Sequence, residues 1–392
     1  MEPRSTLRVA ALVAGVLASA CAPAQGSAGT SAPSIAAPSA SLSPSGLPAG
    51  IKRSSLNPPT NAIFSPDGRY VVYGSGSTLT IIAIDGSLNV STPASGWPRW
   101  LPDSSGLFVA TSAPQRAGPL AFVGLDGKIS ALPLEFTNPM VSNDGTTIVA
   151  EHQEGCCMNI VQREIRVAQR SGGPARVLVT SSAPAAATQS IVLLGIDGQD
   201  RVLYRDDERI ALIPLSGGPS AELAIPRGLV PPFVLADSVS PDRSVILLRT
   251  YEPTAEWMLF NGKLQPFPSE AGAIVRLGAS KGVGASPLWL GAQTILVRTE
   301  SGTLGSYDLA RYTPGYGSNA MQTVLPYVDG DAVLAFGNGA LLWRSGDHVH
   351  IITLDTHRDR DTGLVAPVRL AGAIAGGFLL IGDAGSYEIS AP

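Results

Sequence analysis

A short turn followed by an apolar strand recurs along this chain of 392 residues, and it constrains the fold more than any other feature. The clearest copy is Ser65-Pro66-Asp67-Gly68-Arg69, followed by the run Tyr70-Val71-Val72-Tyr73. Pro66 presets φ for the turn, and Gly68 accommodates the left-handed conformation that would strain other residues. The aromatic and β-branched residues that follow suit a pleated strand. The stretch therefore predicts a tight turn leading into a buried strand.

The turn recurs at regular spacing. The turn centres are Asp67, Asp103, Asp144, Asp197, Asp242, Gly291, Asn338 and Gly376. Their average separation is about 44 residues, which is the period of a four-stranded propeller blade. We therefore predict an all-β fold, a single closed β-propeller of eight four-stranded blades over residues 51–392. Seven blades are the alternative, because Gly291 and Gly376 are weaker anchors than the aspartates.

The last repeat lacks residues for its outer strand, because the chain stops at Pro392 soon after a strand at 387–389. Residues 51–56 have no blade of their own. We expect this N-terminal strand to complete the last blade, which would cover an edge otherwise open to aggregation.

The composition agrees with a turn-rich β fold, since the chain holds 43 Gly and 32 Pro and only 15% charged residues. The formal net charge is −4, and the basic residues are scattered. This pattern argues against a nucleic-acid partner.

The N-terminus has the pattern of an export signal. Arg4 and Arg8 precede an apolar run at 9–20 that is too short to span a bilayer. The run ends in Leu17-Ala18-Ser19-Ala20-Cys21, which resembles the lipobox of bacterial lipoproteins, although Ala18 stands where that family usually has Leu. The resemblance implies that Cys21 is lipidated and becomes the mature N-terminus; ordinary secretory cleavage is the alternative.

Residues 22–50 are rich in Ala, Ser, Pro and Gly, which predicts a disordered tether after the signal at 1–21. We accordingly expect an exported protein that is anchored by lipid to the outer face of the cytoplasmic membrane.

The turn motifs Phe64-Ser65-Pro66-Asp67-Gly68-Arg69 and Trp100-Leu101-Pro102-Asp103-Ser104 carry a second resemblance. They are similar to the WD40-like repeats of TolB-type proteins and of the propeller domains attached to prolyl-oligopeptidase-like peptidases. The resemblance implies a propeller used for binding or gating. It implies no catalytic residues, because those families keep their chemistry elsewhere.

The most unusual local segment is the blade-three loop His152-Gln153-Glu154-Gly155-Cys156-Cys157-Met158-Asn159. Adjacent cysteines in an exported protein would form a strained vicinal disulfide, which suits a redox or ligand platform. A rigid loop staple and two reduced thiols are the alternatives. His152, the two thiolates and Met158 would also suit Cu(I), but the spacing supports this weakly, and we predict no metal site.

Other loops on the same rim supply candidate contacts. The tight blade-four turn carries Asp206 and Asp207, which we interpret mainly as a solvated acidic turn. Further candidates for a ligand or partner surface are Glu154, Arg163, Arg227, Arg276 and Lys281, of which the last three would favour an anion.

His348 and His350 alternate along one strand and therefore share a face, with His357 a few residues later. We find no carboxylate or cysteine at a supporting spacing, so we predict a solvated outer strand rather than a zinc site. Asp359 and Asp361 lie in a run of alternating charges and are interpreted as part of a surface loop. The five tryptophans (Trp97, Trp100, Trp257, Trp289 and Trp343) are expected in the core.

No nucleophile elbow, phosphate-binding loop, dinucleotide fingerprint or zinc-protease motif is present in the sequence. We assign no catalytic residue and identify no cofactor. The sequence favours a membrane-anchored extracytoplasmic scaffold that binds a protein or a small molecule. Two alternatives are a quinoprotein-like or metal-dependent redox enzyme that uses the Cys156-Cys157 loop, and a subunit of a cell-envelope complex.

Overall fold

The computed structural model describes residues 47–94, 96, 98–110, 118–154, 162–181, 191–251, 254–277, 286–312, 320–326, 332–365 and 367–391. Several sequence predictions concern positions outside these residues, namely Cys21, the tether up to residue 46, Trp97, Cys156, Cys157, Met158 and Lys281. The described residues all belong to one compact unit, which spans Leu47–Pro392.

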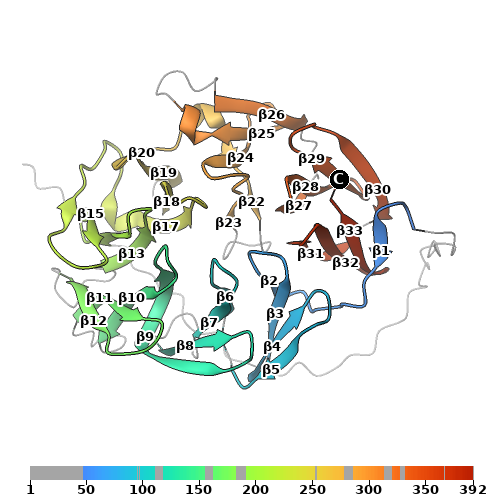
Figure 1. Ribbon diagram of the computed structural model, residues 1–392. Coiled ribbons are helices and arrows are strands. Elements are labelled where there is room, and N and C mark those ends of the chain that lie inside the picture. Colours follow the sequence, from blue (N-terminus) through green and yellow to red (C-terminus); the bar gives the residue numbers. More distant parts are fainter. Residues whose placement is uncertain are drawn as a thin grey trace, which may run out of the picture. The chain divides into compact units, whose positions relative to one another are not determined.

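The described residues form eight four-stranded antiparallel blades, confirming the predicted β-propeller. Within each blade we name the strands A to D, from the innermost to the outermost (Figure 1). Each predicted turn centre, including Gly291 and Gly376, lies between strands A and B of its blade. The propeller therefore has eight blades rather than seven.

The first four blades contain the strands from β2 to β16. Blade one contains β2 (Ile63–Phe64), β3 (Tyr70–Ser75), β4 (Thr78–Ala83) and β5 (Asn89–Thr92). Blade two contains β6 (Pro98–Trp100), β7 (Gly106–Ala110), β8 (Gly118–Gly124) and the first part of β9 (Ile129–Val141). Blade three contains the rest of β9, β10 (Thr147–Glu154), β11 (Gln162–Gln169) and β12 (Arg176–Thr180). Blade four contains β13 (Ile191–Ile196), β14 (Arg201–Asp206), β15 (Arg209–Pro214) and β16 (Ala221–Glu222).

The remaining blades have the same strand order. Blade five contains β17 (Val234–Val239), β18 (Val245–Tyr251), β19 (Thr254–Phe260) and β20 (Lys263–Pro266). Blade six contains β21 (Ala273–Ile274), β24 (Thr294–Arg298), β25 (Thr303–Asp308) and β26 (Met321–Pro326). Blade seven contains β27 (Ala332–Gly337), β28 (Ala340–Ser345), β29 (His348–Thr353) and β30 (Asp359–Val365). Blade eight contains β31 (Val368–Ile374), β32 (Gly377–Gly382), β33 (Gly385–Ser390) and β1 (Ile51–Arg53).

Two features depart from the regular blade pattern. β9 runs without a break from blade two into blade three, pairing with β8 through residues 129–136 and with β10 through residues 137–141. In blade six, the short hairpin of β22 (Arg276–Leu277) and β23 (Ser286–Pro287) is inserted into the inner strand. The described residues also include the 3-10 helices η1 (Pro231–Phe233), η2 (Ser269–Ala271) and η3 (Leu309–Arg311). Among the described residues, no helix has the length and apolarity needed to cross a membrane.

The apolar core is divided between the blade interfaces. The described residues hold eight buried clusters, and each of them joins two consecutive blades. Trp257 and Trp343 are buried in these clusters, while Trp100 and Trp289 pack against them, in agreement with the predicted core role. Apolar packing between adjacent blades is therefore the main source of the stability of the propeller.

The ring closes as predicted, because β1 pairs with β33 through Ile51↔Ile389, Lys52↔Glu388 and Arg53↔Tyr387. Within the described ranges, the cluster between blades eight and one contains three buried side chains, Ile374, Leu379 and Ile381. Backbone contact supports this closing seam, since Ala375 N donates to Gly68 O at 3.2 Å.

The blade topology defines two faces. The A–B face carries the turns joining strands A to B and C to D, and the B–C face carries the loops joining B to C and the connections between blades. β33 ends on the A–B face. β1 begins beside that end, on the same face, because the two strands are antiparallel. Residues 47–50 consequently lead into the ring on the A–B face.

Candidate functional site

The B–C face of blades three to five holds most of the predicted contact residues. β10 and β11 pair through His152↔Glu164, Gln153↔Arg163 and Glu154↔Gln162, which brings the two ends of the cysteine loop together. His152 and Arg163 are half-buried on this stem. The loop itself, with Cys156 and Cys157, lies outside the described residues, so the disulfide stays a prediction.

Asp206 is not a solvated turn residue, contrary to the sequence interpretation. The residue is 3% exposed, and its carboxylate accepts from Ser181 Oγ at 3.0 Å and from Arg209 at 2.8 Å. Ser181 N in turn donates to Arg163 O at 2.9 Å, which links blade three to blade four. Asp207 and Glu208 are exposed, as predicted for this turn.

Arg205 is a buried cation that sequence reasoning missed. It is 0% exposed and donates from Nη1 to the carbonyls of Pro231, Pro232 and Val234 around η1. Burial lowers the pKa of Arg205, and the nearby Tyr251, Glu151 and Asp207 oppose that shift. An arginine amid the apolar β14 run was the available signal, because such a charge is buried only with partners.

Two further missed residues complete this rim. Glu151 Oε1 accepts from Leu193 N at 2.8 Å and joins blade three to blade four. Tyr251 is 44% exposed, and its ring packs against Phe233 with the centroids 5.2 Å apart. We call Glu151, Arg163, Arg205, Asp206, Asp207 and Tyr251 the rim cluster. Its buried members hold the rim in place, while Asp207 and Tyr251 face solvent.

Arg276 does not offer an uncompensated charge to an anion. Its guanidinium binds Asp237 at 2.8 Å and Glu256 at 2.7 Å, so two carboxylates surround one cation. Burial raises the pKa of Glu256, and Asp237 adds to the rise while Arg276 opposes it. Arg276 thereby attaches the β22–β23 hairpin to blade five. Arg227 is exposed, and Lys281 lies outside the described residues.

The histidine strand does have carboxylates beside it, so the sequence expectation of none was wrong. His348 Nδ1 lies 3.0 Å from Asp361 Oδ2, and His350 Nδ1 lies 3.2 Å from Asp359 Oδ2. Trp343 Nε1 also donates to Asp359 at 3.3 Å. These pairs cross from β29 to β30, and Asp359 and Asp361 are strand residues rather than members of a loop.

Within the described ranges, no group of three or more His, Cys, Asp or Glu side chains is arranged to hold a metal ion. Of the soft ligands considered for Cu(I), the structure describes only His152. The copper alternative is therefore untested.

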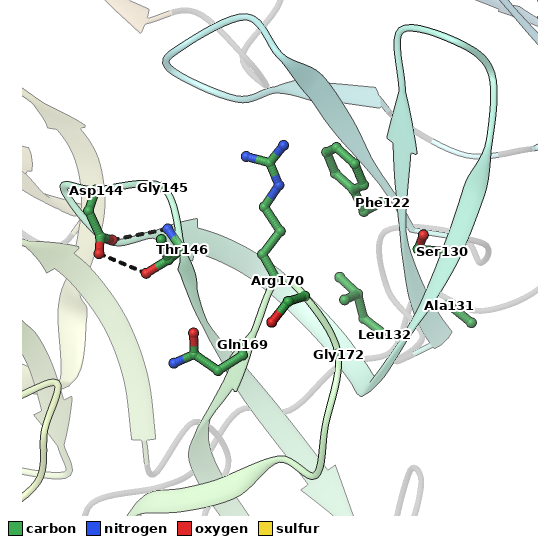
Figure 2. A pocket seen from close by; sticks show the side chains of 11 residues that line it. Phe122, Ser130, Ala131, Leu132, Asp144, Gly145, Thr146, Gln169, Arg170 and Gly172 are labelled. Atoms are coloured by element: carbon green, nitrogen blue, oxygen red, sulfur yellow. Dashed lines mark hydrogen bonds between the residues drawn. The ribbon is translucent and has the colours of Figure 1, made fainter.

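Two cavities lie on the A–B face, opposite the rim cluster. The larger has a volume of about 550 Å³ and lies between blades two and three (Figure 2). Arg170 crosses it with its guanidinium 4.4 Å from the Phe122 ring centroid and donates to Ser105 Oγ at 3.0 Å. Asp144 lines the same cavity, and Arg170 Nη1 lies 3.8 Å from Asp103 Oδ2, which partly balances the charge of the guanidinium. The smaller cavity has a volume of about 350 Å³ and lies beside the ring closure between blades seven and eight.

No protein-family model matches this chain, and no curated protein matches it either. Among solved structures, dihydro-heme d1 dehydrogenase NirN is 16% identical and aligns over 85% of this chain and 73% of its own, with a TM-score of 0.48. Hydrazine synthase from Kuenenia stuttgartiensis is 11% identical over 79% and 96%, with a TM-score of 0.39. A TolB protein from Agrobacterium tumefaciens is 14% identical over 75% and 89%, with a TM-score of 0.35. At these identities the likeness concerns the fold alone, that of a β-propeller with TolB-like neighbours.

Proposed function

We propose that this protein is a membrane-anchored extracytoplasmic β-propeller that binds a protein or small-molecule partner through the B–C rim of blades three to five. The observation that carries the proposal is the direction of the chain: residues 47–50 lead into the ring on the A–B face. If Cys21 is lipidated, the anchored N-terminal segment joins the propeller on that face. The opposite rim is then accessible to a partner.

The rim cluster supports the same proposal. Variable loops on a rigid scaffold are the usual binding surfaces of such folds. Here the scaffold is held by hydrogen bonds of Glu151, Arg205 and Asp206, whereas Asp207, Glu208 and Tyr251 stay exposed on the same rim as the β10–β11 stem. Because these hydrogen bonds already fix the residues that support the exposed side chains, less conformational entropy is lost when a partner binds.

Photocrosslinking of the full chain in its native cells tests the binding face. A photoreactive residue replaces Glu208 on the B–C rim or, as the matched control, the exposed Asp85 on the A–B face. We expect a discrete adduct from position 208 that weakens when Asp207→Lys is added, and no such adduct from position 85. Equal adducts from both positions would contradict a specific rim.

Fractionation of the same cells tests the anchor. The native chain is expected in the membrane fraction, and Cys21→Ser in the soluble extracytoplasmic fraction, because the lipid supplies the attachment. A Cys21→Ser chain that stays with the membrane would refute a lipid anchor at this residue.

A further inference from the structure

Among the described residues, the smaller cavity is lined by two arginines and by no carboxylate. Its walls are formed by Ala49, Gly50, Ile351, Thr353, Arg358, Arg360, Ser390 and Ala391. Its volume of about 350 Å³ falls in the range of small-ligand pockets, which is about 300–1,000 Å³. The hydroxyl-bearing residues Thr353 and Ser390 add hydrogen-bond donors to those of the guanidinium groups.

Arg360 is held in place without being neutralised. Nη1 donates to Ala49 O at 3.1 Å and Nη2 donates to Ser390 O at 3.2 Å, so its partners are backbone carbonyls. Its Nε is buried and has no partner among the described residues. Each terminal nitrogen keeps a second N–H. The guanidinium therefore retains its full charge at a fixed position in the cavity wall.

Arg358 adds a second positive charge. Its side chain is exposed and forms no ion pair within the described part of the chain. Glu388 binds Lys52 at 2.7 Å and Asp359 contacts His350 at 3.2 Å, so neither of these carboxylates is paired with Arg358. The larger cavity differs, because Asp144 is among its lining residues and its Arg170 pairs with Asp103 at 3.8 Å.

We infer that this cavity is a binding site for a phosphate-bearing anion. Two guanidinium groups with several free N–H donors match the charge and the oxygen geometry of a phosphate ester. Because Ala49 and Gly50 line the cavity, the site lies where the tether leads into the ring. The ligand has two possible sources. One is the phosphodiester of an anionic phospholipid, and this source rests on the proposed membrane anchor. The other is a free phosphate ester.

The test uses the full chain carrying Cys21→Ser, so that no lipid anchor contributes to binding. Calorimetric titration with sn-glycerol 3-phosphate measures the site, and flotation with phosphatidylcholine vesicles, with or without phosphatidylglycerol, identifies the source. Arg358→Gln is the main variant, since this exposed side chain has no ion-pair partner among the described residues. Arg311→Gln is the matched control on the same face, where the arginine already pairs with Asp308 at 3.2 Å.

We expect Arg358→Gln to weaken glycerol phosphate binding by about tenfold or more and Arg311→Gln to leave it unchanged. Arg360→Lys keeps the charge but loses the planar guanidinium that reaches Ala49 O and Ser390 O, so it should weaken binding while the protein remains folded at the assay temperature. Flotation with phosphatidylglycerol vesicles that is lost in Arg358→Gln assigns a lipid headgroup, whereas glycerol phosphate binding without flotation assigns a free phosphate ester.

Absence of binding in both experiments would overturn the site, as would an equal loss in Arg358→Gln and Arg311→Gln. Neither outcome bears on the proposed partner rim, which lies on the opposite face and is tested by crosslinks at position 208.

Discussion

Gly68 shows how one residue serves both a turn and a blade interface. Its φ of +67° is left-handed, as the Ser-Pro-Asp-Gly pattern predicts. A Cβ at this position would also lie 2.7 Å from the Ile374 backbone of blade eight. A glycine is thus required for two reasons. Its backbone is left-handed, and the backbone of blade eight approaches it closely where the ring closes.

We predict that Gly68→Ala destabilises the protein more than Gly86→Ala. Gly86 has a similar φ of +76° but open space around it, so its substitution costs only the left-handed strain, about 1–2 kcal/mol. The clash at Gly68 adds about 1–3 kcal/mol. Urea unfolding of both variants measures the difference, and equal losses would show that the seam relaxes freely.

Asp144 illustrates the turn carboxylates at the A–B face. It accepts from Ser142 Oγ at 2.5 Å, from Thr146 N at 3.0 Å and from Thr146 Oγ1 at 2.7 Å (Figure 2 shows the two bonds to Thr146). The Ser142 hydroxyl and the Thr146 donors lower the pKa of Asp144 to about 2. Ser240 and Ser244 bind Asp242 in the same manner.

The lowered pKa of Asp144 predicts a loss of stability in acid. Since the native pKa is below the unfolded value of 3.8, the unfolded chain binds more protons between about pH 4 and pH 2. The stabilisation is complete above pH 4 and is lost as the pH falls towards 2. In urea titrations across this range, Asp144→Asn should show a shallower decline than the native chain. A decline as steep as that of the native chain would contradict this role of Asp144.

At the scale of elements, β1 is a three-residue strand with a large structural role. Ile51 is buried in the cluster between blades seven and eight, and Lys52 pairs with Glu388 at 2.7 Å. Without β1, the edge of β33 would present unpaired amide and carbonyl groups.

We expect deletion of residues 22–53 to lower the free energy of unfolding by about 2 kcal/mol or more, through loss of the buried Ile51 side chain and its strand pairing. The exposed edge of β33 should also make the protein associate with increasing concentration. Deletion of residues 22–46 alone is the control and should change neither property. Melting temperatures measure the loss of stability, and light scattering measures the association. Identical behaviour of the two deletions would contradict a role of β1 in closing the ring.

The blades were predictable because their turn chemistry is local. Pro66, Asp67 and Gly68 are adjacent in sequence, and even Gly291 and Gly376, which lack an aspartate, fall between strands A and B. The continuous β9 and the inserted hairpin at Arg276 were not predictable, since no residue marks a missing turn or an added one. These features depend on how neighbouring blades pack.

The candidate site was less predictable because its contacts cross between blades and strands. Asp206 is buried through Ser181, which lies 25 residues earlier in another blade. His348 meets Asp361 only because the register of β29 and β30 brings residues 13 apart together. Spacing along the chain does not reveal either contact, whereas the charged residue inside the β14 run was a usable signal for Arg205.

At the scale of the whole molecule, intact mass distinguishes a binding scaffold from a cofactor enzyme. For the full chain with Cys21→Ser under non-reducing conditions, we expect a denatured mass two hydrogens below the reduced value, from a Cys156-Cys157 disulfide. We expect no additional native adduct in material purified in phosphate-free buffer. A native adduct lost on denaturation would instead favour a metal or cofactor enzyme.

The pairing of β1 with β33 also determines when the ring can form. Contacts such as that between Ser54 and Glu388 join residues 334 positions apart. The first strand therefore cannot pair until the last strand has been made. During synthesis from the N-terminus, the early blades have to remain as an open arc with an unpaired edge until the final strand emerges. Such late, non-local pairing makes closure slow and keeps the incomplete chain exposed to association with other chains.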